Sequence, residues 1–365
     1  MKKYGLSWVY GTADMYRCDN DGRPDMKDNI WEKKIKVSYI LSIFVILIHF
    51  YPTANFEFNN EVNIQLNRGL NVFLREIVAA YAVPLFFVMS GYFFFRNFTP
   101  QKYPDKIKSR FRTLVIPYIS WNVIMLIWQI FYPLINKHTS NEKYIITVRN
   151  VIKSILFYEA NFQFWFLFYL IFLVAFSIFF WYLLKNRILG SLFIILVLII
   201  RGCLLIDDRT SLAILFFCTG AFIAIHKKDF FETVNYKSSL ISSFIFAVVV
   251  IIQLIEKLQG KSINLYIDTL LFYVATICLW KVFDFFQGIP VKKFMSHFFA
   301  VYALHPTVSL IVNKVVWRFW WKNEWTAFLY VVACVGMTLV VIELFCVILE
   351  KISSRFFNLI MGQRV

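Results

Sequence analysis

Long apolar runs separated by short polar segments dominate the chain after residue 36. A membrane-spanning helix needs about 20 mostly apolar residues. Ten runs come near this length: 37–52, 77–95, 113–134, 163–184, 188–206, 211–225, 239–256, 265–285, 296–313 and 326–349. They lack the alternation of a β-barrel strand, and backbone groups in lipid must be satisfied within the protein. The pattern therefore predicts an all-α, polytopic membrane protein with about ten transmembrane helices.

The composition supports this prediction. Hydrophobic residues make up 59% of the 365 positions, whereas a soluble domain contains roughly 45–50%. A soluble fold of this length cannot hide that much apolar surface, because the surface area of a folded chain falls only slowly relative to its volume. The surplus apolar residues need a lipid environment, so we expect the bilayer to be the solvent.

Charge sets the expected orientation. The formal net charge is +16, and 38 residues are Lys or Arg. If the N-terminus is cytoplasmic, the predicted inside segments hold 25 of these residues and the outside segments hold 13, as expected when basic residues gather on the cytoplasmic side. We therefore predict a polar cytoplasmic segment over 1–36, a transmembrane domain over 37–349 and a cytoplasmic tail over 350–365. No zinc-finger or RNA-recognition motif accompanies the positive charge, so nucleic acid is not an expected partner.

Cysteines and metal-binding patterns add little chemistry. The six cysteines form no CxxC pair and five lie in apolar runs, so we interpret them as small buried side chains. No HExxH motif or cluster of ligands predicts a metal site. Residues 1–36 contain no apolar core of a signal peptide, and we expect the first apolar run to act as an uncleaved insertion signal.

Ionisable residues inside the apolar runs are the candidates for chemistry. His49 lies near the outer end of the first run, and His305 directly precedes Pro306, which interrupts the helical hydrogen bonds. A histidine in a membrane helix needs a partner or a water-filled cavity, and its near-neutral pKa suits acid–base catalysis. An interfacial histidine without chemistry is the alternative for His49. Arg201 and Glu343 are further candidates, with structural ion pairs as the alternative.

Three sequence blocks could contact a substrate. VPLFFVMSGYFFF contains Ser90 and Gly91, which allow close approach of a ligand or, equally, of another helix. KIKSRFRTLVIPYISWN places Arg110 and Arg112 near the cytoplasmic headgroups, where they would bind lipid or ligand phosphates, or only set the orientation. Trp165 begins the fourth run in FQFWFLFYL, as a ligand contact or a member of the aromatic belt.

Taken in order, these blocks resemble the acyltransferase-3 family of multi-pass membrane acyltransferases. The similar segments are VILIHF, VPLFFVMSGY, RFRTLVIPYISWN, the WFL triplet at 165–167 and YALHP. The resemblance implies that His49 is catalytic. It also implies substrate binding by a set of residues along the blocks: Ser90, Gly91, Tyr92, Arg110, Arg112, Asn122, Trp165 and His305.

The resemblance also implies the reaction. Such families transfer an acyl group, usually acetyl, from cytoplasmic acyl-CoA to hydroxyls of surface polysaccharides, lipid-linked glycans or peptidoglycan, in the bacterial inner membrane. We therefore expect an O-acyltransferase with acyl-CoA as donor substrate and no bound cofactor. One departure stands out: many members carry an arginine eleven residues before the first-helix histidine, where this chain has Ser38, with Lys36 two residues earlier.

Two other classes of function fit the same charges in the apolar runs. A transporter or flippase for a lipid-linked sugar would use them along a translocation path, and inverted internal repeats, which we do not find, would favour it. A scaffolding membrane protein would use its basic loops to recruit anionic partners, and it would not depend on acyl-CoA.

Overall fold

A computed structural model of the chain describes residues 29–50, 53, 56–135, 147–203, 205–260 and 264–362. The described residues form helices and no strands, which confirms the all-α prediction. The α-helices are α1 (Asn29–His49), α2 (Glu61–Asn71), α3 (Ala82–Phe95), α4 (Tyr103–Arg110), α5 (Ile116–Ile135), α6 (Val148–Leu156), α7 (Trp165–Ala175), α8 (Ser177–Leu184), α9 (Arg187–Gly202), α10 (Asp208–His226), α11 (Lys228–Glu232), α12 (Tyr236–Gln259), α13 (Leu265–Val282), α14 (Phe298–Phe319), α15 (Ala327–Ile352) and α16 (Ser354–Met361).

Each of the ten predicted runs contains a helix, but not every helix is a clear membrane span. Seven helical stretches among the described residues are long and apolar enough to cross a bilayer, and α7 with α8, bent by 64°, would make an eighth. The remaining two are α1, whose N-terminal part carries several charges, and α9, with 16 residues. A helix of that length spans only about 24 Å, so the count of ten is approximate.

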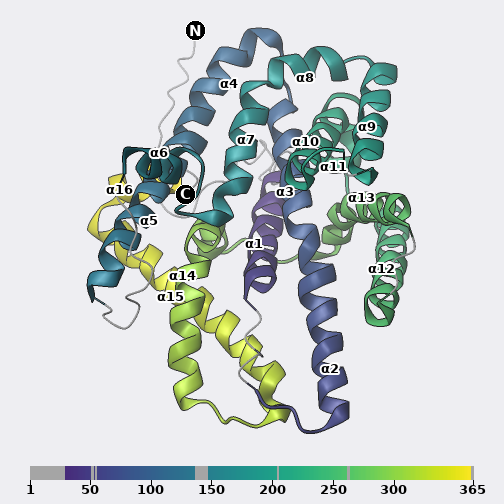
Figure 1. Ribbon diagram of the computed structural model, residues 1–365. Coiled ribbons are helices and arrows are strands. Elements are labelled where there is room, and N and C mark those ends of the chain that lie inside the picture. Colours follow the sequence, from purple (N-terminus) through teal and green to yellow (C-terminus); the bar gives the residue numbers. More distant parts are fainter. Residues whose placement is uncertain are drawn as a thin grey trace, which may run out of the picture.

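Helix α1 lies in the middle of the bundle, with α3 on one side and α14 and α15 on another (Figure 1). It begins at Asn29, eight residues before the predicted start at 37, and the buried Lys33 and Lys36 lie in this extension. Helices α2 and α3 belong to one helical stretch of 35 residues, Glu61–Phe95. At 1.5 Å per residue this is about 52 Å, so the polar α2 extends beyond a hydrocarbon layer of about 30 Å.

The C-terminal residues are packed into the bundle. Helix α15 runs to Ile352, and the short α16 follows with Phe357, Ile360 and Met361 buried. The Trp121 indole N–H of α5 donates a hydrogen bond to the Ile360 carbonyl at 3.0 Å. The segment expected to be a tail therefore holds α5 in place. Residues 1–28 of the predicted N-terminal segment lie outside the described residues.

Two glycines bring α3 and α10 into backbone contact. A Cβ atom built on Gly91 would lie 2.0 Å from the Phe217 carbonyl oxygen, and one built on Gly220 would lie 1.9 Å from the Val88 carbonyl oxygen. No real Cβ atom fits at those distances, so any side chain would push the helices apart. Small residues allow this kind of close packing in membranes, where dispersion contacts replace the hydrophobic effect.

We predict that Gly91→Ala lowers the thermal stability of the detergent-solubilised protein. The added methyl group overpacks the α3–α10 contact, which typically costs about 1–3 kcal/mol. Gly336→Ala in α15 is the matched control, because a Cβ atom there meets nothing within 4 Å and alanine is the better helix former. Melting would be followed by size-exclusion chromatography after heating. Equal melting of the two variants and the wild type would contradict the packing argument.

Candidate functional site

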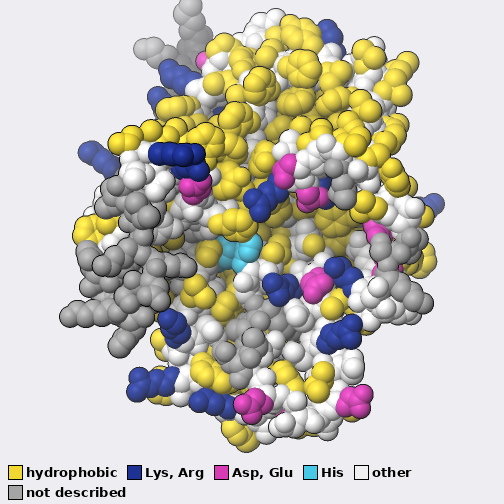
Figure 2. All heavy atoms as spheres, in the orientation of Figure 1, with side chains coloured by type: hydrophobic (Ala, Val, Ile, Leu, Met, Phe, Trp, Pro, Cys, Tyr) yellow, Lys and Arg dark blue, Asp and Glu magenta, His cyan; other side chains and the backbone are white. Residues whose placement is uncertain are grey.

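Two histidines from distant parts of the chain meet at the centre of the candidate site. His49 is the last residue of α1, and His305 lies in α14. Their rings are 5.4 Å apart between centroids, with planes inclined by 27°. His49 is exposed, whereas His305 is fully buried. A histidine surface is visible near the middle of the face shown in Figure 2, with basic side chains nearby.

Hydrogen bonds hold His305 on one side only. Its Nδ1 lies 2.9 Å from the Tyr302 carbonyl oxygen and 3.2 Å from the Val301 carbonyl oxygen. Its Nε2 is buried and has no hydrogen-bond partner among the described residues. Because a carbonyl oxygen can only accept, the geometry assigns the hydrogen to Nδ1 and leaves a lone pair on Nε2.

An aromatic wall borders the histidine pair. Phe162, in a short turn of helix before α7, meets the His49 ring edge-on at 6.2 Å. The guanidinium of Arg209 lies over the Phe162 ring at 5.0 Å and over the Trp165 ring at 5.5 Å. Trp165 therefore contacts Arg209, which contacts Phe162, which in turn contacts His49. Sequence reasoning did not single out Phe162 or Arg209.

Hydrogen bonds and ring stacking connect this wall to α14 close to His305. The Tyr302 hydroxyl donates to the Gln163 carbonyl oxygen, and the Gln163 amide donates to the Ala303 carbonyl oxygen at 3.3 Å. The Phe164 and Tyr302 rings stack at 5.5 Å with planes 7° apart. These contacts fix the start of the WFL block against the helix that carries His305.

The predicted basic block lies apart from the histidines. Lys106 donates hydrogen bonds to the Phe94 and Arg96 carbonyl oxygens, and so caps the C-terminal end of α3. Arg110 is half-buried with its guanidinium over the Phe94 ring, and Arg112 is exposed. Among the described residues, no ion pair, hydrogen bond or ring contact links either arginine to His49 or His305. The proposed binding roles of Arg110 and Arg112 stay predictions.

The SGY block holds helices together. Gly91 faces the backbone of α10, as described above, and Tyr92 stacks on Phe231 of α11 with ring centroids 4.3 Å apart. The Tyr92 hydroxyl and the Arg96 guanidinium both donate to the Glu232 carboxylate at 2.7 Å. Burial favours a higher pKa for Glu232, but these two hydrogen bonds and the charge of Arg96 outweigh it and lower the pKa.

The remaining predicted positions also have packing contacts. The buried Asn122 donates to the Ile155 carbonyl oxygen at 3.1 Å and so fixes α6 on α5. Ser90 lies half-buried in α3. The structure thus groups His49, His305 and Trp165 in one region. The catalytic role of His49 and the substrate-binding roles of all the other predicted residues stay predictions.

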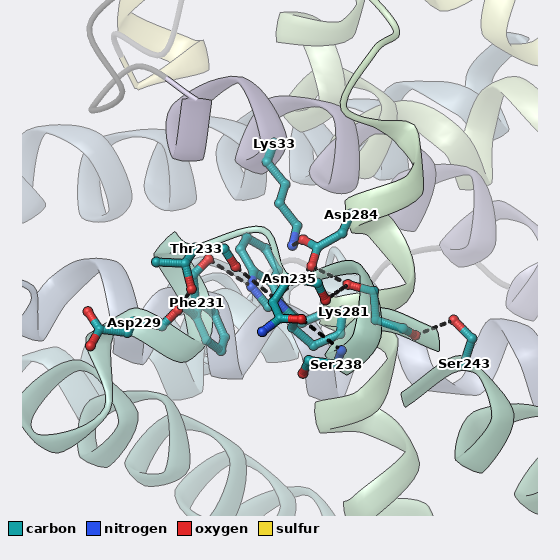
Figure 3. A network of polar contacts seen from close by, with 11 residues as sticks. Lys33, Asp229, Phe231, Thr233, Asn235, Ser238, Ser243, Lys281 and Asp284 are labelled. Carbon is teal, nitrogen blue, oxygen red and sulfur yellow. Dashed lines mark hydrogen bonds and ion pairs between the residues drawn. The ribbon is translucent and has the colours of Figure 1, made fainter. Parts of the chain in front are cut away.

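A buried ion cluster was missed by sequence reasoning. Asp284, just after α13, pairs with Lys33 of α1 and with Lys281 of α13, and Figure 3 shows these side chains pointing toward one another. Ser239 donates to the same carboxylate at 2.6 Å, and Lys281 also donates to the Thr233 carbonyl oxygen at 2.9 Å. All three charged side chains are at most 3% exposed. The available signal was the Lys281–Asp284 spacing, which puts both charges on one helix face at the end of an apolar run.

Lys36 forms hydrogen bonds in the same region of the fold. Its ammonium donates to the Gln287 and Ile289 carbonyl oxygens at 2.9 and 2.8 Å. These carbonyls lie in the connection between α13 and α14, so Lys36 holds this connection against α1. Ser38, at the position of the family arginine, is itself buried. The two other charges noted in the apolar runs form pairs: Arg201 with Asp208, and Glu343 with His297.

Comparison with known proteins gives one match. Residues 39–346 match the model of the acyltransferase-3 family, described as an acyltransferase domain. The chain belongs to the acyltransferase-3 family. No curated protein and no solved structure matches it. The protein is accordingly a multi-pass membrane acyltransferase.

The family match covers most, but not all, of the parts of this acyltransferase described above. The match contains the histidine pair, the aromatic wall, Arg110 and Arg112. It begins after Lys33 and Lys36 and ends before α16. The ion cluster with Asp284 therefore joins a residue outside the matched region to two residues inside it.

We predict that Asp284→Asn destabilises the acyltransferase more than Lys33→Met does. Without Asp284, two buried ammonium groups lose their counter-ion, and breaking such a pair typically costs about 3–5 kcal/mol. Without Lys33, Asp284 still pairs with Lys281. Glu159→Gln, in the exposed Lys153–Glu159 pair, is the control and should cost at most about 1 kcal/mol. Thermal melting in detergent measures all three, and a larger loss in Lys33→Met would overturn the assignment of Asp284 as the shared counter-ion.

Proposed function

We propose that this acyltransferase moves an acyl group, in the first instance acetyl, from acetyl-CoA to a hydroxyl group of a surface polysaccharide or lipid-linked glycan. The observation that carries the proposal is the pairing of His49 with the buried His305 at the end of α1. Two imidazoles in an apolar bundle are energetically awkward unless they bind a polar partner. The aromatic wall and Arg209 beside them suit a sugar-containing ligand.

His49 acts as the general base in this proposal. It removes the proton from the acceptor hydroxyl as the oxygen attacks the thioester carbonyl carbon. The tetrahedral intermediate collapses, the carbon–sulfur bond breaks, and the CoA thiolate receives the proton from His49. Base catalysis of this kind typically contributes 10²- to 10⁴-fold, or roughly 3–5 kcal/mol. Binding both substrates in the correct orientation supplies much of the remaining acceleration.

The donor approaches from the other end of α1. Helix α1 has 21 residues, which at 1.5 Å each makes about 32 Å, and His49 lies at its C-terminal end. We place the CoA phosphates near Arg110 and Arg112, because forked guanidinium groups bind phosphate oxygens well. The pantetheine arm then extends between the helices toward His49, while the acceptor comes from the outer face.

The orientation behind this scheme has its own test. The 25-to-13 distribution of basic residues supports cytoplasmic termini. Reporter fusions after Phe58 and after Tyr103 should therefore lie on opposite sides, outside and inside respectively. Reporters on the same side would contradict the orientation.

The function is tested by two variants measured in two ways. His49→Gln keeps a hydrogen-bonding side chain but is a far weaker base, so acyl transfer to the native glycan in cells should fall at least about 100-fold. Acetyl-CoA binding to the purified variant should stay unchanged. The double variant Arg110→Gln and Arg112→Gln should instead be defective in donor binding. We expect it to bind acetyl-CoA about tenfold more weakly or worse.

Replacing both arginines with lysine is the matched control, and it should keep part of the binding because the charge remains. Protein level and membrane insertion are checked in the same membranes. Near-normal transfer by an inserted His49→Gln variant would overturn the role of His49. Unaltered acetyl-CoA affinity in the double Gln variant would remove the proposed role of the arginines.

A further inference from the structure

The sequence His305-Pro306 has a specific consequence in helix α14. Proline has no backbone N–H, so the carbonyl group of Tyr302, four residues before Pro306, lacks its usual helical donor. The His305 side chain fills this place, with Nδ1 2.9 Å from the Tyr302 carbonyl oxygen. The proline thus creates an acceptor that selects one tautomer of the preceding histidine.

The selected tautomer is neutral with hydrogen on Nδ1. A protonated imidazolium would be fully buried, with its second N–H unpaired, since Nε2 has no hydrogen-bond partner among the described residues. A buried charge without a counter-ion is costly. A neutral imidazole with one hydrogen, donated from Nδ1, keeps Nε2 as an acceptor only.

The two hydrogen bonds of Nδ1 to the Val301 and Tyr302 carbonyl oxygens fix the orientation of the His305 ring. Tyr302 and Ala303 of α14 are hydrogen-bonded to Gln163, and Phe164 stacks on the Tyr302 ring. These contacts hold the turn of helix that carries His305 against the aromatic wall. Nε2 is consequently a fixed, buried lone pair beside the exposed His49.

We propose that His305 is a positioning residue, locked as the Nδ1–H tautomer by Pro306 and Tyr302, whose Nε2 accepts a hydrogen bond from the acceptor substrate. The identity of the substrate group that donates this hydrogen bond rests on the proposed function. A hydroxyl carries one hydrogen, and His49 takes that of the reacting hydroxyl. The hydrogen bond to His305 therefore comes from a neighbouring hydroxyl or amide N–H on the same sugar. The acceptor class is a sugar with such a donor next to the acylated position.

Two substitutions at one position separate this role from a purely structural one. His305→Gln places an amide oxygen near the position of Nε2, whereas His305→Asn places an amide near Nδ1 and keeps the bond to Tyr302. We expect acyl transfer to the native glycan to fall about tenfold or more in the Asn variant and less in the Gln variant. Acetyl-CoA binding should stay unchanged in both. A structural role predicts the opposite order, and activity of Asn equal to or above that of Gln would overturn the proposal.

The tautomer is tested without any activity measurement. The protein contains five histidines, and comparison of ¹⁵N-histidine spectra of the wild type and His305→Gln identifies the signals of His305. We expect a neutral ring with hydrogen on Nδ1. Pro306→Ala restores a backbone N–H for the Tyr302 carbonyl, so it should shift His305 toward a mixture of tautomers. Hydrogen on Nε2 in the wild type, or no change in Pro306→Ala, would overturn the lock. An active His49→Gln variant would instead remove the proposed base and leave this result standing.

Discussion

Polar groups inside a membrane bundle must find their partners within the protein, and this constraint organises the whole structure. In lipid no water satisfies a buried amine or carbonyl. Lys33 and Lys281 therefore converge on Asp284, Lys36 reaches the carbonyls after α13, and Lys106 caps α3. Some of these contacts join segments that are far apart in the chain, and the others lie at the end of a helix. The contacts of Lys33 and Lys36, at the opposite end of α1 from His49, thereby fix where α1 lies.

Placement of α1 decides where His49 lies. Its N-terminal part is held by Lys33 and Lys36, and its last residue, His49, meets α14. On the other side, the glycine contact of α3 with α10 brings the SGY block against α10 and leaves α3 packed on α1. The bundle thus brings two histidines and an aromatic wall together at the C-terminal end of α1, apart from Arg110 and Arg112.

At the candidate site this constraint is left unmet in one place. Several buried polar side-chain atoms of the described residues have no hydrogen-bond partner, and His305 Nε2, beside His49, is among them. An unsatisfied buried acceptor costs about 1–3 kcal/mol, a cost that a bound substrate removes. An unsatisfied buried group in a folded protein calls for an explanation, and a catalytic role is one of them. In the proposed function, such a group orients the acceptor substrate.

Sequence alone determined the all-α class, because continuous apolar runs of membrane-spanning length allow no other economical arrangement in lipid. It also picked out His49 and His305, since an ionisable side chain in an apolar run stands out whatever the fold. It did not reveal that these two meet, nor that Asp284 serves Lys33, nor that Phe162 and Arg209 border the site. Only the tertiary structure decided these, because contacts between helices depend on their relative rotation and depth, and a linear pattern carries neither.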